Sequence, residues 1–401
     1  MIDGVSWDIL TDDLTRAMAA WREGLLDDSG SPTTDVDPPV QAEGTSLRRW
    51  SELLIAAAPD IEADRTYFDD VLAHPDTPLA DDPTELTARV ADEVTRVHEF
   101  GGPGAEALLG EVVTGYAATA EAVLMTALSL TLARFRSEHR PSDHQGAHAH
   151  THSVIELEGH GRETRHIPTP GGGEADLSRT VGWFTTLYPV LVDPGVVDLD
   201  APAEVSRALK AVKDQLAVVP HRGIGYGIGR YLGPEADTAP DRSPQVLFNY
   251  LGRVGTPEAK DFAPLGPTGQ LGERRDPRQR LPRELEFNAI TEPGPDGPVL
   301  RTTISWAAGR FGDDRIGRLL DLWERSLRAV SGIAALASHS AGDFALTPGG
   351  EVILDQDELD AIDGPRLVDV LPLTPLQQGM HFHSIFCLLY TSDAADEGLG
   401  V

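Results

Sequence analysis

An acidic residue at the end of a strand-like run is the group in this sequence best placed for acid–base chemistry. The run 154–157 leads into Glu158, and two glycines then flank His160 in the sequence EGHGRE. The pattern predicts a strand that presents its carboxylate beside an open backbone, where another chain or a cofactor arm can approach closely. In a partly apolar channel, a glutamate has a raised pKa and can accept and return a proton near neutral pH.

Three more motifs follow Glu158 in order, and we expect them to line the same channel. They are GWFTTLYP (182–189), GIGYG (223–227) and FNYLG (248–252). Because Asn249 and Tyr250 end a predicted strand, at least one of these two side chains should face the channel, whereas Phe248 is predicted to be core. GIGYG lacks the Lys-Ser/Thr that follows a phosphate-binding loop, so it does not predict a nucleotide site.

A cluster of five histidines invites comparison with a metal site. Their spacing is irregular, and the residues between them are those of a solvated loop. A zinc site also needs ligand geometry and a second shell of hydrogen bonds. We therefore predict a loop without a metal for this cluster, which comprises His139, His144, His148, His150 and His152.

The composition limits the class of protein and its partners. A chain of 401 residues is long enough for two or more domains, and its net charge of −31 argues against nucleic acid or an anionic membrane as a partner. The single cysteine, Cys387, excludes an intramolecular disulfide and fits a reducing compartment. No apolar run reaches the ~18 residues of a membrane span, and no signal pattern is present, so we expect a cytoplasmic location.

The elements that must position these motifs are helices and strands in mixed order. The helix predicted at 8–24 gathers Ile9, Leu10, Leu14, Met18 and Trp21 on one face. Further helices are predicted at 46–58, 118–135 and 314–332. Ser46 is the expected N-cap of the first of these. The segment 118–135 is apolar nearly all round, so it should be buried. Strands are predicted at 153–158, 189–193, 245–250 and 299–306. Without a strict βαβ rhythm, this order indicates an α+β layered architecture.

Five motifs in this order resemble those of a known family. IDGVSW (2–7), EGHGRE (158–163), RTVGWFTTLYP (179–189), GIGYG (223–227) and FNYLG (248–252) are similar to the signature motifs of epimerization domains of nonribosomal peptide synthetases. These domains belong to the condensation-domain superfamily. The resemblance implies an α+β fold with two chloramphenicol-acetyltransferase-like lobes around a central channel.

The resemblance also implies a division of the chain. The family's HHxxxDG motif aligns its Asp with Asp3, so both histidines fall before residue 1, and about 130 residues of the first lobe are expected to be absent. PLTPLQQGMHFHS (372–384) resembles the start of a following condensation domain, whereas the last fifteen residues depart from that pattern. The expected parts are the rest of the N-terminal lobe (1–102), the C-terminal lobe (103–350), a linker (351–369), the start of a condensation domain (370–386) and a non-native tail (387–401).

By the same resemblance, the substrate is an L-aminoacyl or L-peptidyl thioester on the 4′-phosphopantetheine arm of a carrier protein. Epimerization removes the Cα proton and returns it to the opposite face, which requires proton-transfer groups and a donor to the enolate oxygen. Glu158 is implied as one proton-transfer group, and the missing His as the group that supplies or supports the other side. From its place at the strand end, Tyr250 is predicted either to donate to the enolate oxygen or to help position the proton donor, with Asn249 beside it.

Four further residues are assigned supporting roles. Arg162 can pair with a carboxylate or orient its loop, and Asp3 is expected to bond to backbone near the His motif. Trp183 belongs to the motif at the channel wall, and His160 lies within the Glu158 loop. The chain itself binds no cofactor in this scheme. Its expected partners are an upstream peptidyl carrier domain and a downstream condensation domain.

Two other functions stay open. One is an amide-forming condensation domain of the same superfamily, and the other is a non-catalytic remnant that only docks carrier proteins. EGHGRE and GWFTTLYP favour epimerization, because condensation domains typically have an NTLP-like form of the second motif. The missing His pair favours the remnant, and we expect the chain by itself to be inactive.

Overall fold

The computed structural model of the chain describes residues 2–25, 40, 42–81, 87–139, 151–233, 243–253, 275–345, 354–364 and 367–383. The chain divides into two compact units, residues 1–337 and residues 338–401. Each unit is described by itself below.

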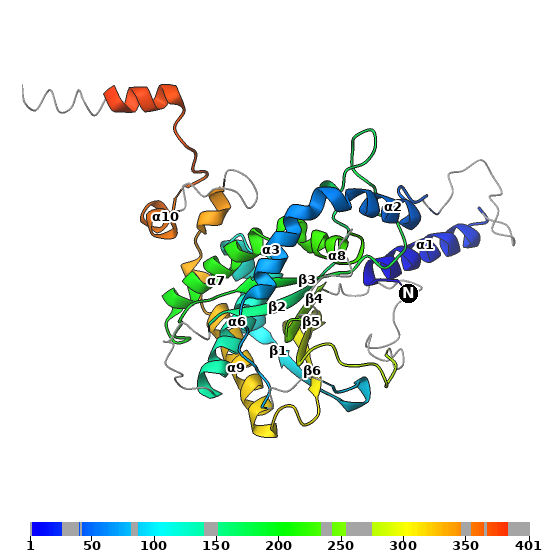
Figure 1. The fold of residues 1–401 in the computed structure, drawn as a ribbon, viewed down its shortest axis with the longest axis horizontal. Helices are drawn as coiled ribbons and strands as arrows, with labels where there is room; N and C mark the ends of the chain where they lie inside the picture. The colour runs from blue at the N-terminus through cyan, green and yellow to red at the C-terminus, as the bar shows by residue number, and fades with distance from the viewer. Residues whose placement is uncertain are drawn as a thin grey trace, which may run out of the picture. The chain divides into compact units, whose positions relative to one another are not determined.

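A mixed sheet of six strands forms the centre of the first unit (Figure 1). Its order is β1-β6-β5-β4-β2-β3. β4 runs parallel to both β2 and β5, and the remaining neighbours are antiparallel. The strands are β1 (Glu93–Phe100), β2 (Ser153–Gly159), β3 (Thr186–Val192), β4 (Val246–Arg253), β5 (Leu285–Gly294) and β6 (Gly297–Ala307).

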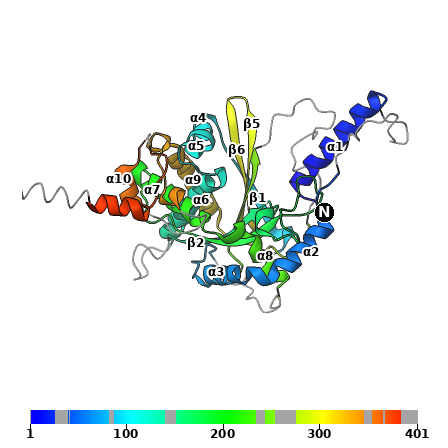
Figure 2. The ribbon, with the colours of Figure 1, turned by 90° about the horizontal axis from the view of Figure 1, so that it is seen from above.

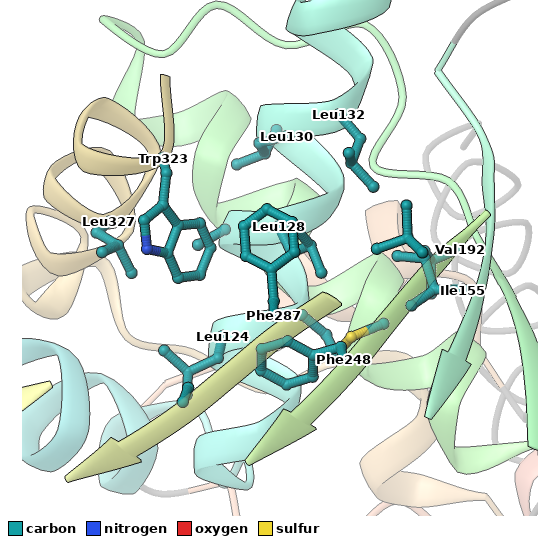
Figure 3. Packing of buried hydrophobic residues seen from close by; sticks show 14 of the residues in the cluster. Leu124, Leu128, Leu130, Leu132, Ile155, Val192, Phe248, Phe287, Trp323 and Leu327 are labelled. Carbon is teal, nitrogen blue, oxygen red and sulfur yellow. The ribbon is translucent and has the colours of Figure 1, made fainter. Parts of the chain in front are cut away.

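Helices cover one face of this sheet and form the main core. Figure 3 shows Leu124 and Leu128 of one helix against Phe248 and Phe287 of the sheet, with Trp323 of a second helix beside them. The Phe287 and Trp323 rings meet edge to face, with centroids 5.7 Å apart. The helices on this side are α4 (Gly102–Glu106), α5 (Val113–Gly115), α6 (Ala120–His139), α7 (Pro202–Ala217) and α9 (Asp313–Ser331).

The prediction that the apolar segment 118–135 is a buried helix is confirmed by α6. Every residue from 122 to 132 is buried. Its polar members do not leave their hydroxyls unpaired, because Thr126, Ser129 and Thr131 donate back to carbonyls one turn earlier. A helix that is apolar all round therefore occupies the middle of the core.

A second, smaller core lies between α2 (Leu47–Ala57), α8 (Ile224–Tyr231) and the loop before β3. Trp50, Leu53, Phe184 and Ile224 are among its buried residues. The predicted N-cap is confirmed, since the Ser46 hydroxyl accepts from the Arg49 amide at 3.2 Å. The next helix, α3 (Glu62–Ala73), packs on α8 and β3.

Most of the predicted apolar face of the first helix is not buried. α1 (Gly4–Arg22) lies on the other side of the sheet from α6 and α9 (Figure 2). Leu10, Leu14 and Trp21 are exposed, and the buried residues of α1 are Ser6, Ile9 and Ala20. Polar contacts attach this helix to the unit, from Asp3 and Ser6 in its first turn and from Asp12 and Asp13 to Arg179.

Several elements carried no prediction, namely α3, β1, α7, α8 and β5. Strands 189–193 and 245–250 were predicted in place but with the wrong ends, since β3 starts at Thr186 and β4 continues to Arg253. β4 continues because a bulge after Tyr250 lets it keep pairing with β5.

The second unit contains the helix α10 (Gln356–Ile362). Its start is fixed by a capping box between Asp355 and Glu358. A helical segment also spans 375–383, within the range predicted to open a condensation domain. The predicted tail 387–401, with Cys387, lies outside the described residues.

In the described part of the chain, no single helix is long and apolar enough to cross a membrane. One bent pair, Gly102–Gly115 with Ala120–Glu138, passes the same test of length and composition at a bend of 114°. Its second member belongs to α6 and is buried in the core.

Candidate functional site

The face of the sheet opposite α6 carries polar side chains from five strands, and we call it the site face. Alternation along β2 turns Ile155 and Leu157 towards α6, and Glu156 and Glu158 towards the site face. The strand register aligns such residues in two rows across the sheet, with Glu158 placed one residue beyond the last β2–β4 pair. The first row is Thr95, Ser305, Glu286, Leu247 and Glu156, and the second row is Val97, Thr303, Asn288, Asn249 and Glu158.

The first row is held by its own contacts. Its two hydroxyl groups lie 3.2 Å apart. Glu156 forms a buried ion pair with Arg283, and the Glu286 carboxylate lies 3.6 Å from the guanidinium of Arg275. Every polar member of this row therefore has a partner within the fold.

The second row lacks such contacts. Among the described residues, no ion pair reaches Glu158, and no hydrogen bond reaches the side-chain amides of Asn249 and Asn288. Asn249 is 8% exposed, while Glu158 and Asn288 are half-buried. Polar groups at such depth are usually paired, so the second row offers hydrogen-bonding capacity that the described part of the fold does not use.

The electrostatic surroundings of Glu158 favour its protonated form. Burial, with a further contribution from the neighbouring carboxylates Glu286 and Glu156, raises the pKa of Glu158 above its ordinary value. Burial also raises the pKa of Glu286, although Arg275 opposes that effect. A glutamate with a raised pKa and no cation partner suits a proton that is first accepted and then returned.

Tyr250 does not join the second row. Alternation along β4 places it on the α6 side, where it packs against the main core. Its hydroxyl lies 2.9 Å from that of Thr291. Of the two residues predicted from FNYLG, Asn249 faces the site, and the role of Tyr250 at an enolate oxygen stays a prediction for mutagenesis. Phe248 is fully buried, which confirms its assignment to the core.

Arg162 joins three of the sequence motifs. Its guanidinium donates to the carbonyls of Leu177 and Thr180, at 2.6 and 2.9 Å. It also pairs with Asp3, at 3.2 Å, and lies over the Phe184 ring, 4.0 Å from the centroid. The loop after Glu158, the loop before β3 and the start of α1 are thus fixed to one another by a single side chain.

Asp3 makes the contacts of a structural residue. Its carboxylate caps α1 by accepting from the Ser6 amide at 2.8 Å, and it accepts from the Phe184 amide at 3.2 Å. Burial raises the pKa of Asp3, but the hydrogen bonds from Ser6 and the charge of Arg162 outweigh this effect and leave the pKa lowered. Asp3 is therefore ionised in its role as anchor.

The rest of the EGHGRE loop turns away from the second row. The His160 side chain is exposed, with Nδ1 accepting from the Arg162 amide and Nε2 3.2 Å from Glu163. Gly161 has a φ of +64°, and a Cβ there would lie 1.6 Å from the carbonyl oxygen of Phe184. Trp183 is 50% exposed. Close packing of two loops therefore accounts for the second glycine of the motif.

GIGYG supports β3 rather than the second row. Gly223, with a φ of +82°, caps α8, and a Cβ there would lie 2.1 Å from the ring of Tyr188 on β3. The two residues before it, His221 and Arg222, also have left-handed φ values of +48° and +50°. His221 Nδ1 lies 2.6 Å from the Asp64 carboxylate of α3, which holds this turn in place.

The described residues contain no group of three or more His, Cys, Asp or Glu that could hold a metal ion. His144, His148 and His150 of the predicted loop lie outside the described residues. His152 binds the carbonyl of Pro75 through Nε2, at 2.7 Å.

Comparison with known proteins decides the family. Residues 1–338 match the family model of the condensation domain. The chain belongs to the condensation-domain family. Chondramide synthase of Chondromyces crocatus is 32% identical over 96% of this chain, and a linear gramicidin synthase of Brevibacillus parabrevis is 30% identical over the same share. The chain spans only 9% and 5% of the lengths of these two relatives.

A solved structure confirms the predicted condensation-superfamily fold. The epimerization domain from the third module of tyrocidine synthetase B matches with a TM-score of 0.63, at 24% identity. The match covers 84% of this chain and 68% of that one. The mixed sheet with its packed helices is therefore a condensation-family fold, as the motif order predicted.

The lobe boundary predicted at 102 does not coincide with a break in the sheet. β1 lies within the range assigned to the first lobe, yet it pairs along its length with β6. The division of this condensation-family chain into lobes stays a proposal.

Sequence reasoning missed Asn288 and the carboxylate of Glu286. A signal was present in LEFNAIT (285–291), where Leu285, Phe287 and Ala289 alternate with polar residues. That alternation predicts a strand with one buried and one polar face. It does not say which strands lie beside it, so the neighbourhood of Glu158 needed the sheet order.

Proposed function

We propose that this condensation-family chain is part of a nonribosomal peptide synthetase and epimerizes an L-aminoacyl or L-peptidyl thioester carried by a carrier domain. The observation that carries the proposal is Glu158, a carboxylate on the site face that has a raised pKa and no ion-pair partner in the described part of the chain. The five ordered motifs and the similarity to an epimerization domain support the same choice within the family.

The proposed chemistry is proton transfer at Cα. The Cα–H bond breaks, its proton goes to a carboxylate oxygen of Glu158, and the electron pair forms an enolate whose charge rests on the thioester oxygen. A second group, the place that the resemblance gives to the histidines of the HHxxxDG motif, returns a proton to the opposite face of Cα, which gives the D form, and Glu158 releases its proton to solvent. The raised pKa of Glu158 makes it a stronger base than an exposed glutamate, although it is ionised only at higher pH.

The substrate would arrive on the phosphopantetheine arm of an upstream carrier domain, and the product would pass to a downstream condensation domain. The arm is covalently part of the carrier, so the chain would bind it as substrate rather than as a resident cofactor.

Amide-bond formation is the second candidate, because the family match is to the condensation domain as a whole. It would need an amine acceptor on a second carrier, and its product would be a longer peptide. Epimerization leaves peptide length unchanged and exchanges the Cα hydrogen with solvent.

The test is solvent deuterium uptake at Cα of an aminoacyl thioester, measured in the synthetase module that contains this chain, with its carrier domain loaded. Glu158→Gln keeps the shape of the side chain but cannot accept the proton, so exchange should fall by at least ~10²-fold. Loading and carrier binding should not change.

Glu286→Gln is the matched control, since this carboxylate lies in the first row and is paired with Arg275. It should retain exchange, and the acidic limb of its pH profile should move to lower pH, because removing a neighbouring negative charge lowers the pKa of Glu158. Undiminished exchange in Glu158→Gln would exclude Glu158 as the base. A lengthened peptide without Cα exchange would establish amide formation instead.

A further inference from the structure

The only two asparagines of the 401-residue chain lie opposite each other on the site face. Asn249 of β4 is the register partner of Asn288 of β5. Asn249 belongs to FNYLG, but Asn288 lies in none of the five motifs. The fold thus brings the side chains of the two asparagines together from positions 39 residues apart, in the same row as Glu158.

We infer that Asn288 is a substrate-binding residue that donates a hydrogen bond, together with Asn249, to the thioester carbonyl oxygen of the carrier-bound substrate. The inference rests on the proposed epimerization. It assigns to the two carboxamides the stabilisation of the enolate oxygen.

The contrast between the two rows supports a ligand-binding role. In the first row the hydroxyls bond to each other and the carboxylates have guanidinium partners, so those residues serve the sheet. Within the described residues, the carboxamides of Asn249 and Asn288 have no hydrogen-bond partner. If these two positions served only to form the strands, Thr or Val would be favoured there, because Asn is a poor strand former.

Geometry allows both carboxamides to reach one oxygen. Neighbouring strands lie about 4.8 Å apart, and directly opposed side chains on one face have Cβ atoms about 5 Å apart. Each carboxamide offers two N–H donors, so two opposed groups can converge on a single carbonyl oxygen between them. Glu158 lies on the next strand beyond Asn249, which places the base on one side of the bound thioester.

The chemistry needs donors of this kind. When Glu158 takes the Cα proton, negative charge develops on the thioester oxygen, and fixed N–H donors stabilise it without giving up their own protons. Neutral carboxamides suit this position better than cations would, because a cation would pair with Glu158 and lower its basicity. Loss of one such donor typically slows a reaction by about 10²–10³-fold.

The experiment compares Asn288→Leu with the unmodified chain in the loaded module, by deuterium uptake at Cα. Leucine has a similar shape without hydrogen-bonding groups, so kcat should fall by at least ~10²-fold. KM for the loaded carrier should stay within about twofold, because the variant removes a contact to the thioester and none to the carrier domain. Asn288→Val is the second variant, to be used if Leu impairs folding, because Val is well accepted in strands.

Glu292→Gln is the control on the same face of the same strand. Its carboxylate is paired with Arg301 at 2.8 Å, and its loss should leave exchange unchanged. The double variant Asn249→Leu/Asn288→Leu should lose less than the product of the two single losses, because both groups serve one oxygen.

The outcomes separate this inference from the function on which it rests. If Glu158→Gln abolishes exchange while folded Asn288→Leu and Asn288→Val exchange at the normal rate, the inference is overturned and the proposed function stands. The inference is also overturned if the exchange rate of Asn288→Leu falls only in proportion to the fraction of the variant that has unfolded, as measured by its melting temperature. If Glu158→Gln exchanges normally, the proposed function and this inference fall together.

Discussion

Among the described residues, Glu158 differs from the carboxylates around it in having no ion pair with a cation. Glu156 and Glu286 lie in the same region of the site face, but each is compensated by an arginine. Burial and the neighbouring carboxylates raise the pKa of Glu158, so ionising Glu158 costs the folded protein free energy. This residue has the properties of a group retained for chemistry rather than for stability.

That cost predicts a dependence of stability on pH. Because the pKa of Glu158 is raised above its ordinary value of 4.5, its favourable contribution is fully present below about pH 4.5 and is lost as the pH rises through the folded pKa. Glu158→Gln should therefore be more stable than the unmodified chain at pH 8. The difference should vanish towards pH 4.

Urea unfolding of both proteins at these two pH values measures the effect. Each unit by which the pKa is raised corresponds to about 1.4 kcal/mol, which is well within the resolution of the method. A variant less stable at pH 8 would show that the Glu158 carboxylate is stabilised by a contact in the folded protein.

The loop after β2 is an element whose shape depends on one glycine. Gly161 combines a left-handed φ with a backbone oxygen at the place where a Cβ would stand. Gly171 also has a positive φ, of +95°, but a Cβ there would meet nothing within 4 Å. Comparing alanine substitutions at Gly161 and Gly171 therefore separates the cost of backbone strain from the cost of the steric clash with the Phe184 carbonyl oxygen.

Gly161→Ala should destabilise the chain by more than about 3 kcal/mol, since strain of about 1–3 kcal/mol adds to displacement of the loop before β3. Gly171→Ala should cost only the strain. Equal losses in denaturant unfolding would mean that the two loops separate easily, and the Arg162 anchor would then be weaker than its contacts indicate.

At the scale of the whole molecule, the charge is strongly unbalanced. The chain has 64 acidic and 33 basic residues, so 31 carboxylates have no matching cation. Mutual repulsion of like charges opposes the compact state, and salt screens it. The Debye length falls from about 30 Å at 0.01 M to about 8 Å at 0.15 M ionic strength.

We therefore expect the melting temperature to rise when NaCl is added over this range. Calorimetry in NaCl and in KCl should give the same rise, because screening depends on ionic strength rather than on the cation. A fall would mean that the arginine–carboxylate pairs of the sheet contribute more to stability than the repulsion removes.

The sequence by itself determined the features that depend on local pattern. Periodicity identified α6 as a buried helix, side-chain chemistry identified the Ser46 cap, and the strand before Glu158 followed from its composition. The motif order also gave the family. These inferences succeeded because a helix face, a cap or a strand end is defined by residues close together in the chain.

The tertiary structure decided what lies beside what. Strand order placed Asn249 and Asn288 in the row of Glu158, and register placed Tyr250 on the opposite face of the sheet. It also left Leu10, Leu14 and Trp21 of α1 exposed, although helical periodicity placed them on one face with the buried Ile9. Such neighbours are set by which strands pair and which surfaces meet, and these contacts join residues far apart in sequence, so no local pattern encodes them.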